Sequence, residues 1–147
     1  MLTVKEILKA KGHEVWAIAP QAKVFEALQV MAEKDVGALL VVESDRLVGI
    51  FSERDYARKV VLEGKSSKET PVNEIMSHKV FYVQPEQTVE DCMALMTNKH
   101  IRHLPVLENG RLMGIISIGD VVKAIISEQE FVIAQLEKYI GGSGYGY

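Results

Sequence analysis

The sequence contains only one cysteine, Cys92, in 147 residues. A single thiol cannot form an intramolecular disulfide, so the composition fits a reducing, cytoplasmic setting. The chain also lacks the run of roughly 18 to 20 apolar residues that a membrane-spanning helix needs, and its first residues do not follow a signal-peptide pattern. We therefore expect a cytoplasmic protein without a membrane partner.

The sequence also lacks a strong excess of either charge, because 17 basic and 20 acidic residues leave a formal net charge of −3. Without a large basic field, nucleic acid is not an expected partner. There is no P-loop and no glycine-rich dinucleotide fingerprint. The four histidines show no metal-ligand spacing: His13, His78, His100 and His103. We therefore predict no metal site and no catalytic residues.

An internal repeat is the strongest feature that the sequence does have. Shifted by 65 positions, residues 22–61 align with residues 87–126 without a gap, and 12 of these 40 positions are identical. Two such half-cores are expected to close on each other about a pseudo-twofold axis. The predicted organisation is repeat 1 (1–64), a linker (65–70), repeat 2 (71–126), and a C-terminal helix with a flexible Gly/Tyr tail (127–147).

Apolar periodicity and turn residues predict the order helix, strand, helix, strand, strand, helix for each repeat. In repeat 1 the predicted strands are 15–18, 39–42 and 47–51, with a turn at 44–45, and the last helix begins near residue 52. This pattern indicates an α/β (α+β) fold in which each repeat has a small mixed sheet flanked by helices. A separate final helix is expected over residues 127–140.

The segments 49–55 and 114–120 share Gly, Ser and Asp at the same spacing. In one interpretation, Ser52 with Asp55 and Ser117 with Asp120 only begin helices as capping boxes. In the other, the exposed helix start and the Ser hydroxyl bind phosphate, while the Asp accepts both hydroxyls of a ribose. The duplication favours the second interpretation, which describes a nucleotide site. Apolar strand residues are candidates for lining the base pocket: Ile18, Val83, Ile50 and Ile115.

On these paired motifs, on the order of the elements, and on residues 101–106, the chain resembles a tandem pair of CBS domains, also called a Bateman module. Residues 52–58 are similar to those of small stand-alone bacterial CBS-pair proteins. The resemblance implies ribose binding by Asp55 and Asp120, and phosphate binding by Ser52 and Ser117. It also implies a regulatory sensor of AMP, ADP, ATP, NAD or S-adenosylmethionine.

Basic residues distinguish the two repeats. Arg102 and His103 stand where repeat 1 has glycine and alanine, and the resemblance implies that they reach phosphate. Repeat 1 offers Arg54 instead. We expect Arg54, Arg102 and His103 to converge on phosphates in a central cleft, with unequal binding at the two sites.

Several alternatives stay open at this point. The ligand is AMP or a related adenine nucleotide, or one NAD that spans both motifs. A ligand-free interaction module and an enzyme are the rival classes of function. Because no effector domain is fused to the repeats, signalling through a homodimer or an unknown effector protein is expected, and the last helix is a candidate dimer surface.

Overall fold

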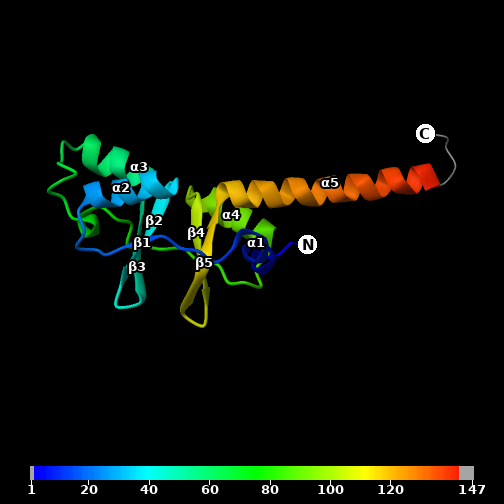
Figure 1. The fold of residues 1–147 in the computed structure, drawn as a ribbon, viewed down its shortest axis with the longest axis horizontal. Helices are drawn as coiled ribbons and strands as arrows, with labels where there is room; N and C mark the ends of the chain where they lie inside the picture. Colours follow the sequence, from blue (N-terminus) through cyan, green and yellow to red (C-terminus); the bar gives the residue numbers. More distant parts are fainter. Residues whose placement is uncertain (1, 143–147) are drawn as a thin grey trace. The chain divides into compact units, whose positions relative to one another are not determined.

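The computed structural model describes residues 2–142. Most of the predicted Gly/Tyr tail therefore lies outside the described residues. The chain divides into two compact units, one formed by residues 2–13 with 83–142 and the other by residues 14–82. We call them the terminal unit and the middle unit (Figure 1). These packing units do not coincide with the two sequence repeats, because the first helix packs with the second repeat.

The middle unit contains a three-stranded sheet in the order β1-β2-β3. Its elements are β1 (Ala17–Ile18), α2 (Val24–Lys34), β2 (Ala38–Glu43), β3 (Arg46–Ser52), α3 (Glu53–Asp55), a π-helical segment (Tyr56–Val61) and a 3₁₀ turn (Val72–Glu74). β1 is parallel to β2, whereas β2 and β3 form an antiparallel hairpin. Apolar residues of α2, β2 and β3 contribute to the core, and Phe51 is one of its largest fully buried side chains.

The terminal unit contains the hairpin of β4 (His103–Glu108) and β5 (Arg111–Ser117) with three helices, as Figure 1 shows. These helices are α1 (Val4–Lys11), α4 (Val89–Lys99) and α5 (Ile118–Gly142). The strand expected before α4 is reduced to one parallel bridge between Val83 and Val106. The predicted mixed α/β fold with two small sheets and a C-terminal helix is confirmed.

The two hairpins repeat each other in register. Ala38 lies opposite Ser52 in one unit, and His103 lies opposite Ser117 in the other. Both residues of the second pair lie 65 positions after their counterparts in the first. Both hairpins have their bulge at the matching place. The turns also match, because both central residues of each turn have positive φ, as a two-residue type I′ turn requires. The duplication seen in the sequence is therefore a duplication of backbone geometry.

The glycine that opens each motif is required for close packing. A Cβ built on Gly114 would lie 2.7 Å from Cδ2 of Leu8 on α1. A Cβ built on Gly49 would lie 2.6 Å from Sδ of Met76 and 3.0 Å from the carbonyl oxygen of Ser77. In each unit, a short segment from elsewhere in the chain thus lies directly against the strand that leads into the motif.

Two helix boundaries differ from the sequence prediction. The helix expected from residue 52 is a single α-helical turn followed by a π-helical segment. The separate helix expected over residues 127–140 is instead continuous with the last helix of repeat 2, giving α5 a length of 25 residues. No glycine or proline occurs from Val121 to Ile140, so nothing ends the helix near residue 126.

Candidate functional site

The start of α5 in the terminal unit is a reciprocal cap. The Ser117 hydroxyl accepts a hydrogen bond from the Asp120 backbone N–H at 3.1 Å, and Asp120 Oδ2 accepts one from the Ser117 N–H at 2.8 Å. Ser52 and Asp55 form the same pair of hydrogen bonds at 3.2 and 3.0 Å in the middle unit. The capping interpretation is therefore correct for both motifs, and a ligand-binding role must be additional to it.

A lysine from the other end of the chain reaches the Asp120 carboxylate. Lys11, in the last turn of α1, donates from Nζ to Asp120 Oδ2 at 2.5 Å and to the Ile115 carbonyl at 2.7 Å. The carboxylate contacts from Ser117 and Lys11 both fall on Oδ2. Among the described residues Oδ1 therefore makes no hydrogen bond, and it is the oxygen that can accept from a ligand hydroxyl.

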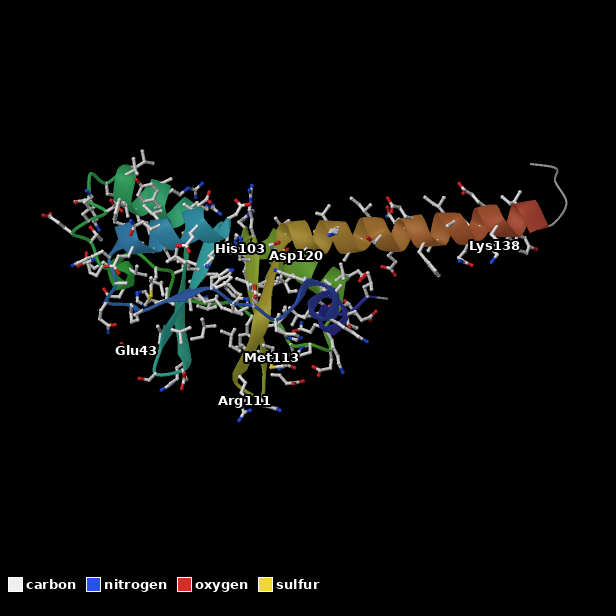
Figure 2. The ribbon with its side chains drawn as sticks, viewed as in Figure 1. Glu43, His103, Arg111, Met113, Asp120 and Lys138 are labelled. Atoms are coloured by element: carbon white, nitrogen blue, oxygen red, sulfur yellow. The ribbon has the colours of Figure 1, made fainter. Side chains whose placement is uncertain are left out.

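His103 and Arg102 complete a group of basic side chains beside this helix start. His103 lies opposite Ser117 in the β4–β5 register, and Figure 2 shows its label next to that of Asp120 at the base of α5. Arg102 is exposed, and its carbonyl accepts from the first N–H of α5 at 2.8 Å. The structure thus brings four predicted residues together in one unit: Arg102, His103, Ser117 and Asp120.

The corresponding helix start in the middle unit has a different charge arrangement. Asp55 is buried, with Oδ2 accepting from the Ser52 backbone N–H and hydroxyl, and with Oδ1 paired to Lys59 Nζ at 3.0 Å. Both carboxylate oxygens therefore have partners. Arg54 is exposed in the same turn. Because Arg54 belongs to the middle unit, its convergence with Arg102 and His103 stays a prediction.

The sequence profile of the CBS domain matches this chain twice, over residues 4–62 and 72–127. The chain belongs to the CBS-domain family. It is 40% identical over 153 aligned residues to the mitochondrial CBS domain-containing protein CBSX3 of Arabidopsis thaliana, covering 97% of this chain and 73% of that protein. The resemblance expected from the motifs is therefore confirmed.

Solved structures agree with this assignment to the CBS family. A CBS-domain protein of Burkholderia ambifaria, described as a putative signal-transduction protein, is 54% identical and superposes with a TM-score of 0.84, covering 86% of this chain and 96% of that one. The CBS domain pair of protein MJ0100 was solved with 5′-methylthioadenosine and S-adenosyl-L-methionine. It superposes with a TM-score of 0.78 at 22% sequence identity, covering 87% of this chain and 98% of that one. The second likeness concerns the fold.

The four residues predicted to line base pockets in this CBS pair fall into two pairs. Ile18 and Ile50 lie on the strands that flank β2 in the middle unit. In the terminal unit, Val83 bridges to Val106 on β4, and Ile115 lies opposite Pro105 on the same strand. Val83 is fully buried, whereas Ile115 is half-buried and shares a face of β5 with Ser117. Ile115 is therefore the more accessible member of its pair.

Sequence reasoning missed both lysines that pair with the motif carboxylates of the CBS domains. Lys59 follows Asp55 by four positions, which is the spacing of neighbours on one helical face, so the sequence carried a signal for this contact. Lys11 is separated from Asp120 by 109 positions. No local pattern links these two residues, because their contact depends on α1 packing with the second repeat.

Other chemistries have little support in the described part of the chain. Burial, followed by the charges of Asp91 and Glu90, raises the pKa of the Cys92 thiol to about 11, so this cysteine stays protonated and unreactive at neutral pH. No group of three His, Cys, Asp or Glu side chains within residues 2–142 is arranged to hold a metal ion. None of the described helices is both long and apolar enough to cross a membrane.

The electrostatics of His103 predict a dependence of stability on pH near neutrality. Burial, and then the charges of Lys11 and Arg102, lower the pKa of His103 despite the opposing effect of Asp120. The unfolded chain therefore binds a proton more readily than the native one, and the free energy of unfolding should rise with pH up to and just above the unfolded pKa of about 6.5. Denaturant titrations between pH 5 and 8 measure this slope.

Replacing His103 by asparagine should flatten that slope, while the same change at the exposed His78 should leave it intact. An unchanged slope in His103→Asn would contradict the assignment of this pH dependence to His103.

Asp120 affects stability at lower pH. Burial opposes its ionisation, but hydrogen bonds from Lys11 and Ser117 and the Lys11 charge hold the pKa of this carboxyl below its usual range. Its contribution is therefore present above the unfolded pKa of about 4 and is lost as the pH falls below it.

Proposed function

We propose that this CBS pair is a regulatory sensor of an adenine nucleotide of the AMP type and has no catalytic activity of its own. One observation carries the proposal. At the start of α5, a carboxylate with one oxygen that accepts no hydrogen bond from the described residues lies beside a Ser cap and three basic side chains within the same unit. A nucleotide needs this pairing of an acceptor for its ribose with donors and positive charge for its phosphate.

In this proposal the ribose hydroxyls donate to Oδ1 of Asp120, and the phosphate binds at the Ser117 hydroxyl. Lys11, Arg102 and His103 supply the positive charge. Burial and neighbouring cations hold the pKa of His103 below its ordinary value, and a bound phosphate would favour its protonated form. Nucleotide binding should therefore be accompanied by proton uptake.

The two motifs should bind with unequal affinity. In the middle unit both oxygens of Asp55 already have protein partners, and the positions of Arg102 and His103 are occupied by Gly37 and Ala38. A ribose there must share the carboxylate with Lys59 and Ser52, whose groups already use most of its acceptor capacity. We therefore propose that the site of the terminal unit fills first.

A thermal-shift panel tests the proposed function. A nucleotide that binds only the native state at a hundredfold excess over its Kd adds about 2.7 kcal/mol to the free energy of unfolding. AMP, ADP, ATP, NAD, NADH, S-adenosylmethionine and adenosine should be compared at equal concentrations. Stabilisation by AMP supports the proposal. No response to any compound would favour the ligand-free interaction module, and turnover of a nucleotide would favour an enzyme.

Lys11 should decide how strongly the site prefers a phosphorylated ligand. In the free protein it occupies Asp120, and with a nucleotide bound its charge can pair with phosphate. We expect Lys11→Met to weaken AMP binding by about 3- to 10-fold, a moderate loss because the side chain is 32% exposed. The same variant should leave adenosine binding unchanged, because adenosine carries no phosphate and its ribose would bind Oδ1, which Lys11 does not contact.

The matched control is Lys9→Met, which removes an exposed lysine from the same helix. It should alter neither affinity. Calorimetric titrations with AMP and adenosine measure both changes. An equal loss of affinity for the two ligands in Lys11→Met would mean that Lys11 does not distinguish them by charge.

NAD is the second candidate ligand, because it contains two riboses and the chain contains two motif aspartates. Binding stoichiometry separates the two candidate ligands, since one NAD per chain contrasts with up to two AMP per chain.

We further propose a cytoplasmic protein that signals through a homodimer or an effector protein. The ligand can shift such a partner equilibrium only by its difference in affinity for the two states.

A further inference from the structure

α5 exposes an unusual amount of apolar surface along most of its length. Eight large apolar side chains from Val122 onward have between 40% and 74% of their surface exposed. Every described residue from Phe131 to Ile140 is exposed. Figure 2 shows side chains standing out along this helix as far as Lys138, near its end. Among the described residues, the apolar side chains of this helix from Phe131 onward are therefore largely open to solvent.

The apolar residues follow a coiled-coil spacing. Steps of four, three, four, three and four residues connect six positions along one side of α5: Val122, Ile126, Gln129, Ile133, Leu136 and Ile140. This is a heptad seam with isoleucine at all three a positions and with Val122, Gln129 and Leu136 at the d positions. We call these six residues the α5 seam. It extends over about 27 Å at 1.5 Å per residue.

We propose that the α5 seam pairs with the same seam of a second copy of this chain, as a parallel, in-register, two-stranded coiled coil. β-branched residues at a favour two parallel strands. A lone polar residue in the seam fixes the register. In register, Gln129 faces its own counterpart, so the two amides can hydrogen-bond. An antiparallel pair would place Gln129 against Ile133 and leave the buried amide without a partner.

Charge also favours a second copy over a membrane surface. The polar side of α5 carries more acidic than basic residues: Asp120, Glu128, Glu130 and Glu137 against Lys123 and Lys138. Amphipathic helices that lie on anionic lipid are rich in lysine and arginine instead. This inference does not depend on nucleotide binding.

Cysteine cross-linking tests the predicted register. In a parallel, in-register pair the two Gln129 positions face each other within disulfide distance, whereas Lys138 points away from the seam. We expect Gln129→Cys to form a disulfide-linked dimer at least about tenfold faster than Lys138→Cys. The native Cys92 is fully buried and does not compete. Equal or slower cross-linking at position 129 would overturn the proposal.

A pair of glutamate substitutions tests whether the seam stabilises the dimer. Ile133 lies in the seam and is 54% exposed, while Phe131 lies outside it and is 65% exposed. In the Gln129→Cys background, Ile133→Glu should slow cross-linking at least about 100-fold, because two carboxylates would be buried in one layer. Phe131→Glu should leave the rate unchanged. Equal effects of the two variants would show that general hydrophobicity, rather than the seam, holds the copies together.

Discussion

Replacing Asp120 by asparagine is expected to weaken AMP binding by about 10- to 100-fold, which corresponds to the roughly 1.5 to 3 kcal/mol of a hydrogen bond to a charged group. The substitution keeps the size of the side chain and one acceptor oxygen. It removes the negative charge that would hold the two ribose hydroxyls. Calorimetric titration of the wild type and the variant with AMP measures the change.

The control for this prediction is Asp91→Asn. Asp91 caps α4 through Thr88 as Asp120 caps α5 through Ser117, with hydrogen bonds of 3.0 and 3.1 Å. Both substitutions should lower the melting temperature, because each weakens a capping box. Only the change at Asp120 should affect AMP binding. Equal binding losses would mean that Asp120 acts through stability alone, and no loss in either variant would remove it from the site.

Replacing Gly114 by alanine is expected to lower the free energy of unfolding by about 1 to 3 kcal/mol, the usual cost of overpacking a core. The new methyl group would lie 2.7 Å from Cδ2 of Leu8, a side chain that is itself 1% exposed and has little room to move. α1 would have to shift away from β5. Because Lys11 lies on the same helix, its contact with Asp120 should weaken as well. Denaturant unfolding measures the loss.

Gly119→Ala supplies a control of opposite sign. The added Cβ would meet only the Ser117 hydroxyl at 3.6 Å, and alanine is a better helix former than glycine by roughly 1 kcal/mol. This variant should be as stable as the wild type or more stable.

In the double variant Leu8→Ala with Gly114→Ala, the combined loss in free energy of unfolding should be smaller than the sum of the losses in the two single variants. Additive losses would contradict a direct contact between these residues.

The repeated parts of the fold were predictable because local chemistry determines them. The turn at Ser44 and Asp45, the strand leading into each motif, and the Ser and Asp caps all depend on neighbours within a few positions. The same chemistry occurs again 65 residues later and produces the same register. The predicted group of Arg102, His103, Ser117 and Asp120 follows from this, since strand pairing places His103 opposite Ser117.

The parts that were not predicted depend on contacts between distant segments. α1 packs beside β5 although the sequence places the first helix in repeat 1, and this arrangement brings Lys11 to Asp120. The reduction of the expected strand before α4 to a bridge at Val83 likewise has no local signature. The length of α5 was missed for a different, local reason: its apolar residues suggested a separate helix, although no glycine or proline ends the preceding helix.

Calorimetric titration of the wild-type chain with AMP tests the proposed nucleotide sensor most directly. The account predicts saturable binding in which the tighter site is lost in Asp120→Asn and kept in Asp91→Asn. It also predicts proton uptake on binding, seen as a dependence of the measured heat on the ionisation enthalpy of the buffer. The absence of saturable binding for AMP, and equally for ADP, ATP and NAD, would contradict it.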